Sequence, residues 1–214
     1  MTTERGYHHG DLRASLISRA LAIVEASGYE AVSLRALAEE LSVTRGAPYR
    51  HFPERDQLLA EVAFIGFQRA HALIGIALKE AAEPVEQLFR SGRFFLRFAR
   101  ENPQLFRLMY DSGLLQRIDD FPHLAQAQRE TYDAVYSLYA QAAGKSGAAK
   151  DKAMQARVVA YWATLFGYAK LLQADMLQSY MKGRIAAQDL EDEVLRTATG
   201  PEISAKLAGT HISR

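Results

Sequence analysis

The sequence predicts an all-α protein: an N-terminal three-helix domain with a helix-turn-helix, followed by a larger antiparallel helical domain. Apolar residues recur at the i, i+3, i+4, i+7 spacing of helices along most of the 214 residues, and no stretch alternates with the period of a strand. Prolines and capping residues mark where helices begin. Residues 33–52 hold two short helical patterns separated by only two residues.

Composition excludes several classes of function. Cysteine is absent, which excludes disulfides and thiolate metal sites and favours a reducing, cytoplasmic location. No apolar run approaches the roughly 18 residues of a membrane span, so no membrane partner is expected. The sequence lacks the common hydrolase, metalloprotease and dinucleotide-binding motifs. We therefore expect no catalytic residue, cofactor or metal.

The N-terminal segment is expected to be a polar, mobile arm followed by a helix. Asp11 is placed to cap this helix, which ends at Gly28. His8 and His9 in the arm leave three interpretations open: a metal ligand, a phosphate contact, or solvated side chains. No acidic or cysteine cluster accompanies them, which disfavours the metal.

The two-helix motif spans residues 33–52. Ser33 is expected to cap a first helix whose apolar stripe is Leu34, Leu37, Ala38 and Leu41. After a two-residue break, Thr44 is expected to cap a second short helix. In that helix Pro48 and Phe52 should face the core. Pro48 lacks an amide hydrogen, so the helix should be short and irregular at its start.

The outer face of the second helix has the chemistry of a nucleic-acid probe. It carries Gly46 and Ala47, which let a partner approach the backbone, and Arg50 and His51, which can donate to phosphates or base edges. An ordinary αα-hairpin with a solvated basic face is the alternative. Net charge does not decide between them, because residues 1–56 carry seven arginines against eight acidic residues.

Residues 7–63 resemble the DNA-binding domain of the TetR family of bacterial transcriptional regulators. The resemblance covers three helices, the Gly28-Tyr29 turn, the two-residue break and the ending Tyr49-x-His51-Phe52. Together with the side chains on the outer face of the second helix, this resemblance implies contacts to double-stranded DNA from these residues: Ser33, Arg35, Thr44, Arg45, Gly46, Ala47, Tyr49, Arg50, His51 and Arg55.

Their expected roles differ. Arg45 should read a base, most plausibly guanine, and the Ala47 methyl can meet a thymine methyl. Phosphate contacts are expected from the remaining polar side chains: Ser33, Arg35, Tyr49, His51 and Arg55. Arg50 suits either role, and for Arg55 a plain surface arginine is the alternative. The acidic residues Glu25, Glu30, Glu39 and Glu40 are expected on other faces.

Further helices are expected at about 55–79, 84–100, 102–115, 122–143, 149–182 and 187–198. The expected domains are therefore residues 1–56 for DNA binding and 57–199 for effector binding and dimerisation, with a loose tail at 200–214. The loop at 144–150 contains Gly-Lys-Ser but lacks the upstream glycine and strand of a phosphate-binding loop.

The helix expected at 149–182 is apolar on more than one face, which predicts a partner helix and a homodimer. The expected interface is its main stripe with a companion helix: Met154, Val158, Trp162, Leu165, Ala169, Leu172, Met176, Leu190 and Val194. A second apolar set, Val159, Phe166 and Leu177, lies beside the stripe. Trp162 and Gly167 fit a Trp-x-x-x-His-Gly pattern of one group of TetR-like C-terminal domains. Because Phe166 replaces the histidine, no role of that histidine is carried over.

By analogy with the family, aromatic and methionine side chains of the middle helices are expected to surround an unknown small apolar or aromatic effector. These are Phe94, Phe95, Phe98, Phe106, Met109, Tyr110, Tyr132, Tyr136 and Phe166. The function expected is a homodimeric repressor that an effector releases from a palindromic operator. A DNA-binding protein with a solid core and no effector, and a transcriptional activator, remain alternatives.

Overall fold

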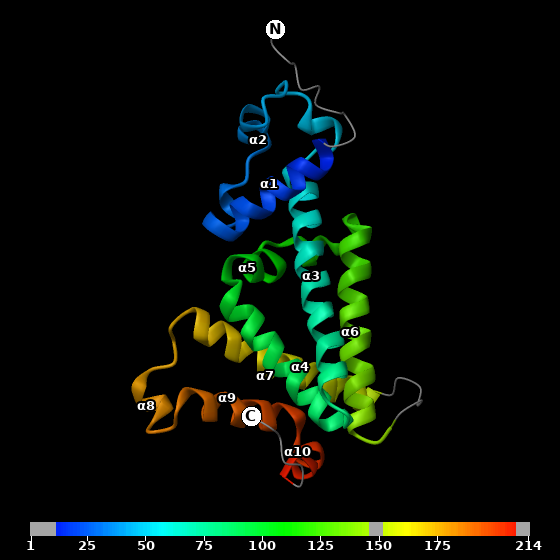
Figure 1. Ribbon diagram of the computed structural model, residues 1–214, viewed down its shortest axis with the longest axis vertical. Helices are drawn as coiled ribbons and strands as arrows, with labels where there is room; N and C mark the ends of the chain where they lie inside the picture. The colour runs from blue at the N-terminus through cyan, green and yellow to red at the C-terminus, as the bar shows by residue number, and fades with distance from the viewer. Residues whose placement is uncertain (1–11, 146–151, 209–214) are drawn as a thin grey trace. The chain divides into compact units, whose positions relative to one another are not determined.

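The computed structural model describes residues 12–145 and 152–208, and every regular element in these ranges is helical (Figure 1). The predicted all-α class is confirmed. Asp11, His8 and His9 lie outside the described residues. The chain forms two compact units, and each is described by itself: unit 1 comprises residues 1–68 and 102–128, and unit 2 comprises residues 69–101 and 129–214.

Unit 1 is built on a core of α1 and the first turns of α3. Its elements are α1 (Leu12–Ser27), η1 (Tyr29–Ala31), α2 (Leu34–Glu40), η2 (Pro48–Arg50), the beginning of α3 (Arg55–Glu80), α5 (Pro103–Asp111), η3 (Leu114–Asp120) and the start of α6 (Pro122–Ala142). Leu16, Ala20 and Val24 of α1 are fully buried. Leu34, Leu37 and Ala38 of α2 are buried as well.

The structure divides the chain differently from the expected boundary at residue 56. Helix α5 packs against α1 and η1, although the sequence suggests that it belongs to the effector domain. Leu105, Phe106 and Leu108 of α5 are completely buried, and Arg107 pairs with Glu30 at 2.7 Å. A hydrogen bond from its own backbone and the nearby Arg107 lower the pKa of Glu30. Apolar burial thus joins α5 to the N-terminal helices.

Helix α3 runs without a break through the expected domain boundary. By length and composition alone it is apolar enough to cross a membrane, contrary to the expectation from the sequence. Core helices of soluble proteins meet the same criterion. In unit 1 the side chains of Leu58, Leu59 and Val62 are buried, so this part of α3 serves as a core helix.

Unit 2 has α4, α7 and α9 packed against one another (Figure 1). Its elements are the end of α3, α4 (Pro84–Glu101), most of α6, α7 (Lys152–Gln173), α8 (Ser179–Lys182), α9 (Ala187–Thr199) and α10 (Pro201–Ala208). The close approach of α4 to α7 is centred on Gly92. Beside it the Tyr161 hydroxyl donates to the Leu88 carbonyl at 3.1 Å, and burial raises the pKa of Tyr161 far above its usual range.

The expected helix at 149–182 is too long. Helix α7 ends at Gln173, and Asp175 adopts a left-handed conformation with φ of 50°. The Met176 amide donates to the Leu171 carbonyl at 2.9 Å, which closes the helix with the bond pattern of a Schellman motif. The short helix α8 is separated from α7 by this turn.

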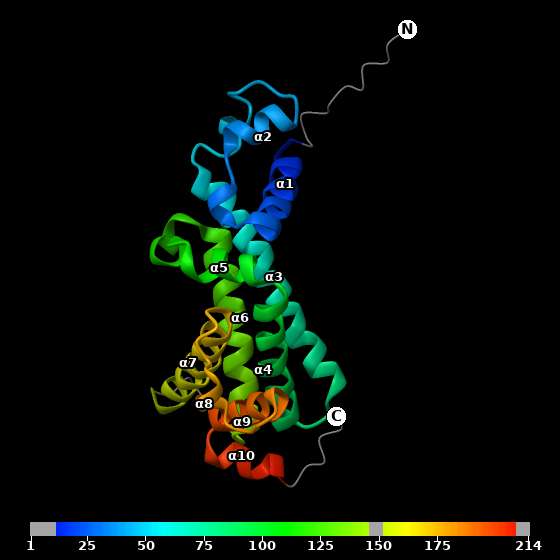
Figure 2. The same cartoon turned by 90° about the vertical axis from the view of Figure 1, so that its left-hand side faces the viewer.

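The expectation of a loose tail from residue 200 is wrong for residues 201–208, which form α10 after α9 (Figure 2). Pro201 starts the helix, and Ile203 and Leu207 are buried. The Lys206 ammonium donates to the Ala142 carbonyl at 2.9 Å. Two apolar anchors one turn apart therefore tie the segment to unit 2.

The close approach at Gly92 gives a stability prediction. A methyl group at this position would lie 2.7 Å from both the Tyr161 hydroxyl and Leu195 Cδ2. Gly92→Ala should therefore lower the free energy of unfolding by about 1–3 kcal/mol through overpacking. Urea denaturation measures the change.

Gly75→Ala is the matched control, because a methyl group added at this position of α3 would have no neighbouring atom within 4 Å. This change should raise the free energy of unfolding by roughly 0.5–1 kcal/mol, since alanine favours helix. Equal effects of the two substitutions would contradict the packing described for α4, α7 and α9.

Candidate nucleic-acid interface

Helix α2 begins and ends with defined caps. Ser33 has extended backbone angles, and its Oγ accepts from the Ala36 amide at 3.4 Å, as predicted for an N-cap. At the other end Ser42 is left-handed with φ of 55°. The Val43 amide donates to the Ala38 carbonyl at 3.0 Å and the Ser42 amide to the Glu39 carbonyl at 3.2 Å, a Schellman motif.

Residues 44–51, which we call the reading turn, do not form the expected second α-helix. The Ala47 amide donates to the Thr44 carbonyl at 2.9 Å, and only Pro48–Arg50 form a 3₁₀ turn. Pro48 supplies no amide hydrogen, which accounts for the predicted irregular start. No side-chain cap from Thr44 is found at η2, and Ala47 is in the helical region although it precedes a proline.

The side chains of the reading turn divide between core and solvent largely as predicted. Pro48 and Phe52 are buried. The Arg45 side chain is 74% exposed, Tyr49 is 47% exposed, and Arg50 is exposed. Ala47 and His51 are half-buried, whereas Thr44 and Gly46 are exposed. The exposed set therefore combines two arginines and a tyrosine on a backbone with little side-chain cover.

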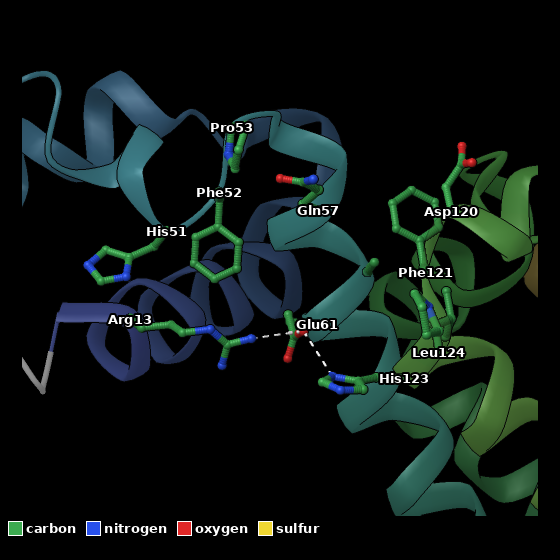
Figure 3. A pocket seen from close by; sticks show the side chains of 12 residues that line it. Arg13, His51, Phe52, Pro53, Gln57, Glu61, Asp120, Phe121, His123 and Leu124 are labelled. Carbon is green, nitrogen blue, oxygen red and sulfur yellow. Dashed lines mark ion pairs between the residues drawn. The ribbon is translucent and has the colours of Figure 1, made fainter.

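Figure 3 shows how the end of the reading turn is held in unit 1. Phe52 is 2% exposed, and the Arg13 guanidinium lies 5.4 Å from the centre of its ring. Arg13 also pairs with Glu61 at 2.9 Å, and Glu61 lies 3.5 Å from His123 Nδ1. These residues and His51 line a cavity of about 290 Å³. Packing from α1 and α3 thus compensates for the short hydrogen-bonded turn.

Two nitrogen atoms of the Arg55 guanidinium donate to backbone carbonyls of the protein. Its Nε donates to the Val32 carbonyl at 2.9 Å, and its Nη2 donates to the Tyr29 carbonyl. Tyr29 lies in η1 and Val32 follows it, so Arg55 links this part of the chain to the start of α3. The structure supports a positioning role for Arg55, and its contact with a DNA phosphate stays a prediction.

Glu39 lies beside the candidate DNA contacts and not on another face, so that expectation is wrong. Its Oε1 is 3.4 Å from Arg35 Nε and 4.0 Å from Arg45 Nη2. The i, i+4 spacing of Arg35 and Glu39 is the sequence signal that identifies the first contact. The contact between Arg45 and Glu39 has no such signal, because it depends on the geometry of the turn after α2. Glu40, in contrast, pairs with Arg19 of α1.

The expected dimer residues lie on different faces of unit 2. Met154, Val158, Leu165 and Ala169 are at most 2% exposed within the unit, so the expectation that they contact a partner is wrong. They face the unit's own core because α4 and α9 pack against α7. Leu190 and Val194 are half-buried. Of the expected set, the exposed side chains are Trp162, Leu172 and Met176.

Another apolar face of α7 is open within unit 2. Val159 is 53% exposed and Trp162 43% exposed, and the Trp162 ring stacks on Phe166 with centroids 5.1 Å apart. Small exposed or half-buried residues run beside them: Ala156, Ala160, Ala163 and Gly167. We call these seven residues the α7 outer face.

The expected effector residues are distributed over both units. Phe106, Met109 and Tyr110 belong to unit 1, where the first two are fully buried core residues. Unit 2 contains the others: Phe94, Phe95, Phe98, Tyr132, Tyr136 and Phe166. Neither unit alone brings the nine side chains together.

Two family models match the chain. The model described as "Bacterial regulatory proteins, tetR family" matches residues 16–62. The model described as "Tetracyclin repressor-like, C-terminal domain" matches residues 88–195. The matches therefore cover both the helix-turn-helix region and most of the helices that follow it.

Individual relatives agree with these models. The HTH-type transcriptional repressor KstR of Mycolicibacterium smegmatis is 35% identical over 98 residues, 45% of this chain and 48% of the relative, so the match spans about half the length of that protein. A protein of unknown function from Rhodococcus sp. RHA1 is 30% identical, with a TM-score of 0.71 over 94% of this chain and 98% of its own.

The fold recurs in RolR, solved in complex with resorcinol, which is 17% identical with a TM-score of 0.66 over 96% of this chain and 97% of its own. At that identity the likeness concerns the fold alone. The two family models carry the assignment, because together they match most of the chain. This protein belongs to the TetR family of bacterial regulatory proteins.

Proposed function

We propose that this protein is a cytoplasmic, homodimeric transcriptional repressor that binds a palindromic DNA operator and is released by a small aromatic or apolar effector. The observation that carries DNA reading is the reading turn, which presents Arg45, Tyr49 and Arg50 to solvent. KstR, a relative over part of the chain, is a transcriptional repressor by name. The TetR family, to which this chain belongs, consists of regulatory proteins and not of enzymes.

Five exposed residues have roles in this proposal: Arg35 of α2 and Arg45, Gly46, Tyr49 and Arg50 of the reading turn. We call them the reading surface. Arg45 reads guanine through two parallel hydrogen bonds, because its guanidinium fork matches the O6 and N7 acceptors of that base. Arg35, Tyr49 and Arg50 bind phosphates and fix the register of the turn in the major groove. Gly46 allows close approach, because no protein atom lies within 4 Å of the place a side chain would occupy.

Selection from a random-sequence DNA library should yield a palindrome whose half-sites lie about one helical turn apart. On that sequence Arg45→Ala should cost roughly 1–3 kcal/mol of binding free energy and relax preference at one base position. Fluorescence anisotropy on a set of single-base variants measures both quantities.

Arg107→Ala is the control, because it removes a positive charge from the same unit at a residue paired with Glu30. If Arg45→Ala weakened binding equally on every DNA sequence, Arg45 would be a phosphate contact and would not read a base. Failure of the wild-type protein to enrich any sequence would contradict the proposed function.

We further propose that the α7 outer face forms the dimer interface. A helix with Val159 and Trp162 exposed gains free energy by burying them against a second copy. A Cβ added at Gly167 would have no neighbouring atom within 4 Å. Gly167 and the alanines of this face therefore allow another helix to approach closely.

Val159→Glu should raise the dimer dissociation constant by roughly tenfold or more, since it buries an unpaired charge in an apolar contact. Sedimentation equilibrium measures this constant. Gln141→Glu provides the same new charge at an exposed position of α6 and should leave the constant unchanged. Equal dimerisation of both variants and the wild type would exclude the α7 outer face as the interface.

The effector is proposed from the aromatic content of unit 2 and from the fold shared with RolR, which binds resorcinol. Tyr132 and Tyr136 have ring centroids 6.3 Å apart, a spacing at which aromatic rings interact favourably. Effector binding would stabilise a conformation with weaker DNA affinity, and the difference between the two affinities sets the response.

A thermal-shift panel of phenols and apolar carboxylic acids, with resorcinol included, should identify a ligand that raises Tm by several degrees at saturating concentration. Tyr136→Ala should abolish the shift, while Tyr180→Ala, at a position 84% exposed, should retain it. A panel without specific stabilisation would favour a constitutive DNA-binding protein.

A further inference from the structure

We propose that Glu39 determines the sequence specificity of the reading surface, by positioning Arg45 and by weakening contacts of this surface with DNA that lacks the matching base. The inference rests on the proposed DNA-reading function. Glu39 belongs to the last turn of α2, and the 4.0 Å between its Oε1 and Arg45 Nη2 joins that helix to the reading turn.

The geometry gives Glu39 two arginine neighbours on a solvent-exposed surface. The same Oε1 atom faces Arg35 Nε at 3.4 Å, and the side chains of Glu39, Arg35 and Arg45 are 58%, 66% and 74% exposed. Exposed ion pairs contribute little to folding stability. The pairs can therefore open and re-form when DNA approaches, and the carboxylate acts mainly on binding.

The Glu39 carboxylate affects phosphate contacts and guanine contacts of the arginines to different degrees. A phosphate that approaches Arg35 or Arg45 also approaches Glu39, and the two negative charges repel each other over a distance shorter than the Debye length. The guanine edge carries no net charge and offers only acceptors to Arg45. Glu39 therefore weakens phosphate contacts more than it weakens guanine contacts.

Positioning adds to this effect. A guanidinium has five N–H donors in a planar fork, so Arg45 can face the Glu39 carboxylate and donate to guanine at the same time. Fixing the side chain before binding lowers the conformational entropy lost in the complex. Because the carboxylate biases Arg45 toward one orientation, it favours a base at one position over its neighbours.

Glu40 provides a matched comparison one residue away. It carries the same charge at the end of the same helix, but its partner is Arg19 of α1, which is not a candidate DNA contact. If net charge alone mattered, removing either carboxylate would have the same consequence. If proximity to Arg45 matters, only Glu39 affects specificity.

The test compares the wild type with Glu39→Gln, Glu40→Gln, Arg45→Ala and the double variant Glu39→Gln/Arg45→Ala. Dissociation constants are measured for the selected operator and for a scrambled duplex of equal length, over a series of salt concentrations. Glu39→Gln should bind the scrambled duplex about tenfold more tightly at low salt, with a salt slope steeper by about one. Thermal melts check that each variant is folded.

The ratio of operator to scrambled affinity should fall about tenfold in Glu39→Gln and change less than about twofold in Glu40→Gln. In the Arg45→Ala background, Glu39→Gln should leave this ratio unchanged, since the positioned side chain is gone. A wild type that selects an operator while Glu39→Gln behaves as Glu40→Gln overturns the inference alone. A wild type that selects no sequence overturns the proposed function and this inference with it.

Discussion

The guanidinium of Arg55 donates to the Tyr29 and Val32 carbonyls, and the position of the reading turn depends on this contact. The turn has few hydrogen bonds of its own, so its geometry is fixed from its two ends. The left-handed Ser42 sets the direction in which the chain leaves α2. The buried Phe52 and the half-buried Arg55 set the place where the chain enters α3. An arginine expected to contact DNA thus directs two of its donor nitrogens into the protein.

Local chemistry accounts for what could be predicted in unit 1. The Ser33 cap, the inward Pro48 and Phe52, and the irregular turn follow from hydrogen-bonding capacity and helical period. The direction of Arg55 could not be predicted, because its acceptors lie more than twenty residues earlier in the chain. The Glu39–Arg45 contact likewise depends on the turn geometry and not on sequence spacing. Long polar side chains are placed by tertiary structure.

Unit 2 shows the corresponding limit for apolar side chains. Periodicity identifies α7 as a helix with two apolar faces, but it does not indicate which face is covered by the same chain. Met154 and Val158 are buried because α4 and α9 pack on their side. Gly92 allows that approach, and a single glycine in α4 does not reveal its partner helix. Val159 and Trp162, on the other face, are exposed.

The brevity of the reading turn limits how much sequence information one protomer can extract. A 3₁₀ turn of three residues with one preceding arginine is short, so it can contact only about three or four base pairs, and a sequence of that length recurs by chance roughly every 100 base pairs of a genome. If the protein acts as the proposed homodimer, two such sequences at a fixed separation occur by chance only with the square of that frequency. For the proposed homodimer, the strength of association between the two copies is therefore itself a determinant of which genomic sites are occupied.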